Sequence, residues 1–339
     1  MRDVATVDYH TEGEPFRIVA DPPVEFSGAT VAERRAKAIG SAEAKKLREF
    51  LCYEPRGHAD MYGGFIVPPD DEGAHLGVLF WHKDGFSTAC GHGTIALGAW
   101  AIQSGLVDPD ASGVTDVVID VPSGRVTAKV TTVDDGQVAS VEFVNVPSYV
   151  LHRDVPVKTS KGELSVDVVY GGAIYAHLPA SQAGLTVTPD NYSELIAIGR
   201  EVKWLLNETE YAQHPADDRL SGIYGTILFD DLGREENSGS PHQRNVTVFA
   251  DGEVDRSPCG SGSCSRVANL ADAGELAPGM PLIHDSIVST RFHAGFRKRT
   301  TVEGYQAVVP YVEGIAHRTG RHIFELDPAD ALGTGFVLR

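Results

Sequence analysis

The sequence predicts an α/β (α+β) protein built from two similar halves, and three observations lead to this prediction. Short runs rich in Val, Ile, Tyr and Phe, bounded by Gly, Pro or Asp, are typical of strands. Two longer stretches have helical periodicity. A strand–loop–helix pattern around a Cys-Gly loop occurs twice, 169 residues apart in a chain of 339. Because strands and helices do not alternate along the chain, a doubly wound parallel sheet is not expected.

The expected strands span residues 73–82, 116–121, 164–178, 221–229, 244–250, 305–312 and 322–326. The first long helical stretch, 32–51, follows Thr30, which forms a capping-box signature with Glu33. The second, 191–208, begins just after Pro189. Its apolar face consists of Leu195, Ile198, Val202 and Leu205 or Leu206. We expect both helices to be scaffold.

Composition and charge exclude several classes of partner. The chain has 29 Lys and Arg against 47 Asp and Glu, a net charge of −18, and no basic run that would neutralise phosphates. We therefore expect neither nucleic acid nor a membrane as a partner. The longest apolar helical run, 95–102, is far shorter than the about 20 residues needed to span a bilayer. Charges and a Pro near the N-terminus are unlike a signal peptide, and four cysteines suggest reduced thiols, so we expect a cytoplasmic protein.

The internal repeat is the most informative feature of the sequence. Residues 89–107 and 258–276 both read C-G-x-G-[ST] followed by a helical run. A Gly follows each Cys by fifteen residues, and Phe80 and Phe249 each precede a Cys by ten. The repeat predicts two halves, each with its Cys where a loop enters a helix.

The spacing of the repeat also places the boundary between the halves. The first half is expected to span 1–135, with residues 322–339 returning to it as a last strand, and the second half to span 136–321. Since only two copies are present, a solenoid of short repeats is excluded.

Cys90 and Cys259 are the candidate catalytic residues. A thiol at a helix N-terminus lies at the positive end of the helix dipole, which lowers its pKa from about 8.5 towards neutrality. Helix N-termini also bind carboxylates. If the halves face one another, one thiolate can remove the α-proton of a bound carboxylate while the other thiol protonates the opposite face. This arrangement predicts inversion of an α-carbon.

Other interpretations of the cysteines remain open at this point. A Cys in a Gly-rich turn can be a small buried hydrophobe, which is our interpretation of Cys52 and Cys264, because they have no repeat partner. Cys90 with His92 could form the nucleophile and base of a hydrolase or transferase, although two residues is a short spacing. A non-enzymatic carboxylate-binding module is a further alternative. Neither C-x-x-C nor H-E-x-x-H occurs, so no metal site is expected from Cys90, His92 and Cys259.

Two polar residues beside the cysteines are candidate ligands of the substrate. Asp255, four residues before Cys259, could hold a substrate ammonium group, or it could cap its own turn. His92 could bind the substrate carboxylate, or it could cap the loop of Cys90.

The two loops resemble the signature loops of the proline racemase family, in residues 84–98 (DGFSTACGHGTIALG) and 249–263 (FADGEVDRSPCGSGS). Similar segments are HTEGEP at 10–15, YEPRGHADMYG at 53–63, YGTILFD at 224–230 and GFVLR at 335–339. The resemblance implies a diaminopimelate-epimerase-like fold, with two pseudo-symmetric halves that each wrap a curled sheet around a central helix. It also implies chemistry without a cofactor on proline or hydroxyproline, and a homodimer.

The resemblance assigns roles residue by residue. Cys90 and Cys259 match the acid/base pair, and Phe249 matches an aromatic side chain that lines the ring pocket. The positions that match substrate contacts are Gly91, His92, Asp255, Gly260 and Ser261. Cysteine at position 259, where dehydratases of the family carry Thr, favours a racemase or epimerase acting on proline or 4-hydroxyproline. The motifs YGTILFD and GSGS favour the alternative, a trans-3-hydroxy-L-proline dehydratase.

Overall fold

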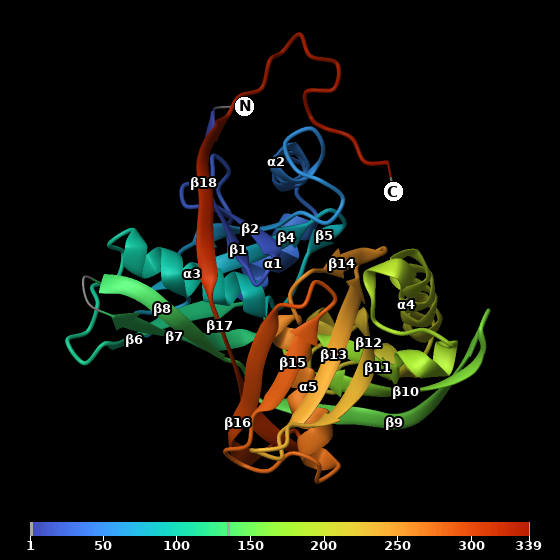
Figure 1. Cartoon of the computed structure of the whole chain (residues 1–339). Helices are drawn as coiled ribbons and strands as arrows, with labels where there is room; N and C mark the ends of the chain where they lie inside the picture. Colours follow the sequence, from blue (N-terminus) through green and yellow to red (C-terminus); the bar gives the residue numbers. More distant parts are fainter. Residues whose placement is uncertain (1–2, 134–135, 339) are drawn as a thin grey trace. The chain divides into compact units, whose positions relative to one another are not determined.

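The computed structural model describes residues 3–133 and 136–338 (Figure 1). Two compact units make up the chain, residues 1–141 with 315–339 and residues 142–314. The mixed α/β class expected from the sequence is confirmed. The expected strands fall in β4, β6, β10, β11, β12, β13, β17 and β18, whereas β1 to β3, β5, β7 to β9 and β14 to β16 were not among the expected strands.

The first unit wraps a sheet around one helix. Its strands are β1 (Val4–Thr11), β2 (Glu14–Val19), β3 (Tyr62–Val67), β4 (Leu76–His82), β5 (Gly85–Phe86), β6 (Val114–Val121), β7 (Gly124–Val133) and β18 (Ala316–Phe324), and β8 (Gln137–Val144) leads into the second unit. The central helix α3 (Gly91–Gln103) packs against β7, β1 and β2. Every residue of α3 from Gly91 to Ile102 is buried, so the helix is the core of this unit.

The last strand of the chain belongs to the first unit. β18 pairs with β1 in antiparallel register from Val4 opposite Phe324 to Thr11 opposite Ala316, and the red strand lies beside the blue one in Figure 1. The observed strand therefore begins and ends earlier than the expected strand 322–326, because pairing with β1 sets both of its ends.

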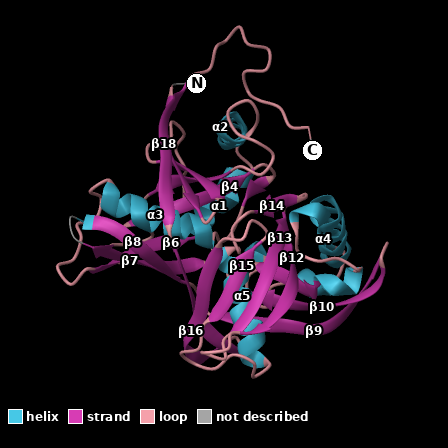
Figure 2. Cartoon of the chain, viewed as in Figure 1, coloured by secondary structure: helices cyan, strands magenta, loops and turns pink. Residues whose placement is uncertain are grey.

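The second unit is a closed ring of strands around a helix. Its strands are β9 (Ser148–Thr159), β10 (Gly162–Tyr170), β11 (Ile174–Pro179), β12 (Ile223–Arg234), β13 (Pro241–Phe249), β14 (Glu253–Asp255), β15 (Leu282–Ser286), β16 (Arg291–Val302) and β17 (Tyr305–Gly314). Pairing runs from β9 through β10, β11, β12, β13, β15 and β16 to β17, which pairs again with β9. Helix α5 (Gly260–Asp272) lies inside the ring (Figure 2), where Gly260 to Ala271 are buried.

Local turn chemistry divides two of the expected elements. The helical stretch 32–51 is two helices, α1 (Val31–Ile39) and α2 (Ala42–Cys52). Gly40 ends the first, and the Ser41 hydroxyl accepts a hydrogen bond from the Ala44 N–H to begin the second. The expected strand 164–178 is the β10–β11 hairpin, whose turn contains Gly172 at φ +88°.

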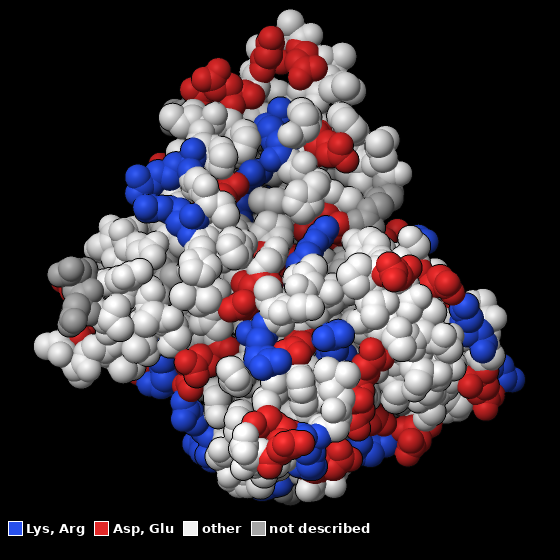
Figure 3. Space-filling view, viewed as in Figure 1, with Lys and Arg blue, Asp and Glu red and all other residues white. Residues whose placement is uncertain are grey.

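The second scaffold helix, α4 (Tyr192–Asn207), covers β12 and β13 of the second unit. Leu195, Ile198, Val202 and Leu206 form its buried face. Leu205, the alternative to Leu206, is exposed. The residues before α4 form a short 3-10 turn, Pro189–Asn191. In the face drawn in Figure 3, Lys and Arg lie among Asp and Glu. No helix within the described ranges is both long and apolar enough to cross a membrane.

Candidate active site

Cys90 is the N-cap residue of α3, as the sequence predicts. Its backbone is extended, with φ −156°, and its Sγ accepts a hydrogen bond from the Gly93 N–H at 3.2 Å. The Thr94 hydroxyl donates to the Cys90 carbonyl at 2.8 Å. A Cβ added at Gly93 would lie 2.8 Å from the Cys90 Sγ and 2.4 Å from the Phe16 ring. A glycine is therefore required three residues after Cys90 to bring the N–H up to the sulfur.

His92 lies against the thiol of Cys90, with both ring nitrogens 3.5 Å from the sulfur. The edges and faces of Phe16 and Tyr62 enclose the imidazole, at centroid distances of 5.8 and 4.9 Å. Burial lowers the pKa of His92 to about 3, so the ring is neutral at physiological pH. A neutral, weakly basic imidazole can donate one N–H to a ligand, but it is a poor base for a thiol. This argues against the Cys–His hydrolase alternative.

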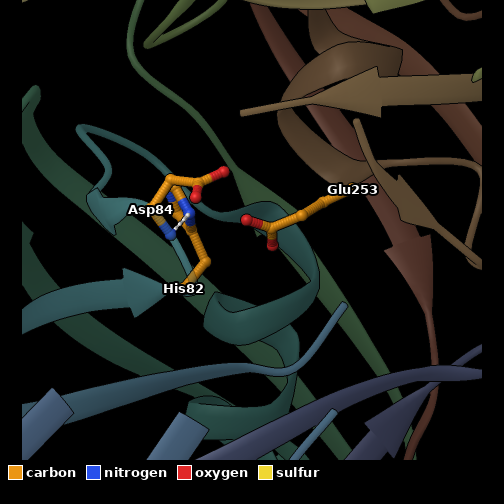
Figure 4. A group of neighbouring side chains, drawn as sticks. All are labelled: His82, Asp84 and Glu253. Carbon is orange, nitrogen blue, oxygen red and sulfur yellow. Dashed lines mark hydrogen bonds between the residues drawn. The ribbon is translucent and has the colours of Figure 1, made fainter. Parts of the chain in front are cut away.

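An acidic residue precedes each of the two cysteines at the same distance in the sequence. In the β4–β5 turn the Asp84 N–H donates to His82 Nδ1 at 3.2 Å (Figure 4), and the Lys83 ammonium contacts the Asp84 carboxylate at 2.7 Å. Glu253 on β14 precedes Cys259 by six residues, as Asp84 precedes Cys90. Asp84 is exposed whereas Glu253 is buried. The repeat thus extends N-terminally from each cysteine, with different surroundings for the acid.

Cys259 is the N-cap residue of α5, but its geometry differs from that of Cys90. Its φ is +65°, in the left-handed region, and its side chain forms no capping bond. The Cys259 N–H donates to the Ser257 hydroxyl at 3.1 Å. A Cβ at Gly262 would lie 2.8 Å from the Cys259 Sγ and 3.0 Å from Ile227 Cδ1. The glycine three residues after the cysteine therefore has the same steric role in both units.

Burial determines the protonation of Cys259. Desolvation raises the pKa of its thiol well above the ordinary value, and the neighbouring Asp255 carboxylate raises it further. The nearby Gly262 N–H and Thr247 hydroxyl act in the opposite direction, and their effect is weaker. The expectation that the helix N-terminus brings this thiol towards neutrality is wrong for Cys259, because the thiol is only 5 % exposed and has an acid beside it. Cys259 is a protonated thiol in this structure.

Asp255 is a buried acid at the end of β14. Its Oδ1 accepts hydrogen bonds from the Ser257 N–H at 2.8 Å and the Ser257 hydroxyl at 2.7 Å. Burial raises the pKa of the carboxyl to about 6, although the Ser257 and Cys259 hydrogen bonds and Arg256 lower it. The two Ser257 bonds match the turn-capping interpretation of Asp255. Such a perturbed carboxyl beside a buried thiol is also typical of a functional site.

Aromatic side chains of the second unit lie around Cys259. Phe249, the last residue of β13, stacks on Tyr224 at 5.6 Å between centroids, and Tyr224 contacts Tyr175 edge-on at 5.8 Å. The Tyr175 hydroxyl lies 2.7 Å from Ser261 Oγ and 4.0 Å from the Cys259 Sγ. The structure therefore brings Phe249, Asp255, Gly260 and Ser261 to the N-terminus of α5, just as it brings Gly91 and His92 to the N-terminus of α3.

The sequence analysis missed Tyr175, Thr247 and Ser257. Tyr175 and Thr247 stand in ordinary strand sequences, and the repeat does not mark them, because Thr6 and Val78 occupy the matching positions. Ser257 could have been noticed, since Thr88 matches it and is another hydroxyl residue. The other two cysteines are fully buried: the Cys52 Sγ lies 3.4 Å from the Met61 carbonyl, and Cys264 is inside α5.

A cavity of about 1020 Å³ in the first unit lies away from the cysteine. Trp100 and Ser104, at the C-terminal end of α3, help to line it. At 1.5 Å per residue, Trp100 is roughly 15 Å along the helix from Cys90. Since no cysteine lines this cavity, it is not the candidate active site.

Comparisons with known proteins agree with this description. The proline racemase family model matches residues 6–337. A trans-3-hydroxy-L-proline dehydratase from Bacillus cereus is 41 % identical, over 98 % of this chain and 97 % of the relative. A 3-hydroxyproline 2-epimerase from Burkholderia multivorans is 43 % identical, over 100 % and 99 %. The crystal structure of a hydroxyproline epimerase from Agrobacterium vitis, with bound trans-4-hydroxy-L-proline, aligns with a TM-score of 0.91 and 31 % identity, over 100 % of this chain and 95 % of that one.

A curled sheet around a buried central helix, with a cysteine at the helix N-terminus, occurs in both units of this chain. Together with the family match, this makes the chain a member of the proline racemase family. The expected diaminopimelate-epimerase-like fold is confirmed.

Proposed function

We propose that the protein is a racemase or epimerase, working without a cofactor, that inverts the α-carbon of proline or a hydroxyproline. One observation supports this most strongly: each unit has a buried cysteine at the N-terminus of its central helix. A glycine three residues later lies against each sulfur, and at Cys90 its backbone N–H donates to the sulfur. A racemase needs one acid and one base of this kind, one for each face of the carbon.

In the proposed reaction, the Cys90 thiolate removes the α-proton of the L-substrate. The Cys259 thiol then gives its proton to the opposite face, which leaves a Cys90 thiol and a Cys259 thiolate. The reverse direction exchanges the roles. The raised pKa of Cys259 supports its assignment as the proton donor. Backbone N–H groups at the helix N-termini and the neutral His92 stabilise the charge that develops on the substrate carboxylate.

Asp255 and the aromatic side chains would hold the rest of the substrate. The Asp255 carboxylate binds the ring ammonium when it is ionised, and Phe249 with Tyr224 packs against the ring. The structural relative with bound trans-4-hydroxy-L-proline supports a 4-hydroxylated ring. The relative named for 3-hydroxyproline supports a 3-hydroxylated ring as well. We also infer a homodimer and a cytoplasmic location; size-exclusion chromatography with light scattering tests the dimer.

Dehydration of trans-3-hydroxy-L-proline is the second candidate function. The relatives that are named as such dehydratases, at 41 and 43 % identity over nearly the whole chain, favour it. Elimination needs one base for the α-proton and an acid for the leaving hydroxyl group. Cys90 could supply the first, and Cys259 or a neighbouring hydroxyl the second.

One experiment separates the two functions. The purified protein is incubated in D₂O with L-proline, trans-4-hydroxy-L-proline and trans-3-hydroxy-L-proline in turn. Optical rotation and α-deuterium are followed for inversion, and formation of a cyclic imine is followed for dehydration. Inversion with uptake of one deuterium supports the epimerase. Imine formation without inversion supports the dehydratase, and no reaction with any of the three contradicts both.

A further inference from the structure

The backbone of Cys259 is in an unfavourable conformation that Cys90 avoids. Cys259 has φ +65°, whereas Cys90 has φ −156° at the same place in the repeat. A left-handed conformation is unfavourable for a residue with a Cβ, and it persists only where the surrounding structure enforces it. Some group beside Cys259 must therefore hold the peptide that precedes it.

The carbonyl of Pro258, directly before Cys259, is held by two side chains. Asn245 Nδ2 donates to this oxygen at 2.9 Å, and Ser263 Oγ donates to it at 3.1 Å. Asn245 on β13 and Ser263 on α5 are both fully buried. Two donors from different elements fix the orientation of the Pro258–Cys259 peptide plane, and with it the φ of Cys259.

His284 on β15 orients the Ser263 hydroxyl. Its Nδ1 lies 2.7 Å from Ser263 Oγ. Because a hydroxyl has a single proton, Ser263 can donate to Pro258 only if it accepts a hydrogen bond from His284 Nδ1–H. Burial lowers the pKa of His284 to about 3, so the ring is neutral and carries this proton on one nitrogen. The result is a chain of bonds with one direction, from His284 through Ser263 to the Pro258 carbonyl.

The repeat shows that this use of the hydroxyl is specific to the second unit. Thr94 stands where Ser263 stands, four residues after its cysteine. Its hydroxyl donates to the carbonyl of Cys90 itself, at 2.8 Å, which is an ordinary contact within a helix. Only the hydroxyl of Ser263 reaches back one residue further, to the peptide bond that sets the left-handed conformation.

We propose that Ser263, oriented by His284, is a positioning residue for the reaction of Cys259. It keeps Cys259 in the left-handed conformation, in which its sulfur makes no capping bond with the helix N-terminus and lies 4.0 Å from the Tyr175 hydroxyl. Without the Ser263 bond, the Cys259 backbone relaxes towards the extended conformation of Cys90, in which the sulfur accepts the N–H of the glycine three residues later. That bond would stabilise the thiolate, so Cys259 would become a more reactive nucleophile and a poorer proton donor. The role of Ser263 in turnover rests on the proposed function, whereas its effect on the reactivity of the Cys259 thiol does not.

The test compares Ser263→Ala with two matched variants. Ser263→Thr keeps the hydroxyl and should restore the wild-type behaviour. Ser265→Ala removes a hydroxyl from the same helix that is equally buried and also contacts a buried histidine, His177, at 2.8 Å, but does not touch Pro258. Asn245→Ala removes the other donor to the Pro258 carbonyl, and it replaces Ser263→Ala if that variant does not fold.

Iodoacetamide alkylation of Cys259 and Cys90 is measured by peptide mass spectrometry without substrate, so Cys90 is an internal reference. We expect the rate at Cys259 relative to Cys90 to rise about tenfold in Ser263→Ala, the effect of one gained hydrogen bond to the thiolate. The ratio should stay at the wild-type value in Ser263→Thr and Ser265→Ala. In turnover, kcat should fall about tenfold or more with little change in KM.

Equal ratios in Ser263→Ala and Ser265→Ala, or a slower Cys259 in Ser263→Ala, would overturn the proposal. A changed ratio in a protein that turns over no form of proline would instead overturn the proposed function and leave the positioning of Cys259 intact.

Discussion

Cys90 and Cys259 have different environments although similar loops carry them. The Cys90 thiol has a neutral imidazole within 3.5 Å. Burial raises the pKa of the Cys259 thiol, and a nearby buried acid raises it further. An active site can make one group the acid and another the base by giving them surroundings that separate their pKa values. Substitutions of single residues should therefore affect the two cysteines differently.

Replacing each cysteine should separate inversion from elimination. Cys90→Ser should lose both reactions, because serine provides no base at neutral pH. Cys259→Thr should lower the rate of inversion on the order of 10³-fold, since it removes the proton donor of one face. It should retain or gain dehydration of trans-3-hydroxy-L-proline, because Cys90 still takes the α-proton and a hydroxyl group can protonate the leaving group. Polarimetry and an imine assay measure the two reactions.

The control for this experiment is Cys52→Ser, which changes a buried cysteine outside both loops. It should keep the ratio of the two activities, whatever it does to stability. Inversion of proline by Cys259→Thr at nearly the wild-type rate would contradict the assignment of Cys259 as proton donor.

Asp255→Asn should abolish turnover and should make the folded protein more stable at pH 8. Its folded-state pKa of about 6 lies above the ordinary 3.8, so the folded protein binds this proton more tightly than the unfolded chain does. This stabilisation is present at low pH and is lost as the pH rises through about 6. Asparagine can accept the same two Ser257 bonds without a buried charge. The variant should therefore match the wild type near pH 4 and exceed it by roughly 3 kcal/mol at pH 8.

Urea unfolding at pH 4, 6 and 8 measures the difference. Turnover of Asp255→Asn should be lost at every pH, because a neutral amide cannot hold the substrate ammonium. In the wild type, kcat/KM should decline as the pH falls below about 6. A constant stability difference from pH 4 to 8 would show that the carboxyl does not titrate as the structure indicates.

Each central helix has a glycine in its first turn, three residues after its cysteine. Gly93 and Gly262 let a backbone N–H approach the sulfur, and a methyl group at either place would lie 2.8 Å from that sulfur. Gly40, which ends α1, is less crowded, because a Cβ added there would lie 3.8 Å from the Lys37 carbonyl oxygen, an ordinary van der Waals distance. An added methyl group should therefore be tolerated at Gly40 but not at Gly93 or Gly262.

Gly93→Ala and Gly262→Ala should each reduce turnover about 100-fold, because the added methyl group displaces the thiol from its reacting position. Overpacking should also cost about 1–3 kcal/mol of stability. Gly40→Ala is the matched control and should leave turnover unchanged. Thermal melts and steady-state rates are compared for all three, and unchanged rates in both loop variants would mean that the helix N-termini do not hold the thiols.

At the scale of the whole molecule, the reaction is expected to need only groups that the chain provides. Two thiols, an acid and the N-termini of two buried helices would supply every proton and every stabilising charge. A net charge of −18 also makes a polyanionic partner unfavourable.

Protein that has been dialysed against a chelator should therefore keep its full rate. The comparison is with untreated protein and with protein to which divalent metal or pyridoxal phosphate has been added back. A rate that is lost on dialysis and returns with either addition would contradict chemistry by the cysteines alone.

Local sequence patterns were sufficient to predict which segments carry the candidate site and where the two central helices begin. The repeat placed Cys90 and Cys259 at the N-termini of α3 and α5, because a Cys-Gly loop followed by an apolar run is a local signal. The sequence pattern predicted one helix where the structure has α1 and α2. A glycine such as Gly40 is tolerated inside a helical pattern, and the pattern does not show that the Ser41 hydroxyl caps a new helix.

The backbone conformation and the pKa of the thiol in the second unit follow from tertiary contacts that the local sequence does not show. The left-handed backbone of Cys259 depends on Asn245 and His284, which are distant in the sequence and come close only when the strands close around α5. Its protonation depends on the depth of burial and on Asp255, which outweigh the helix dipole that the sequence suggested. Local patterns specify which groups stand at a helix end, whereas desolvation and hydrogen bonding between distant strands set their pKa and their orientation.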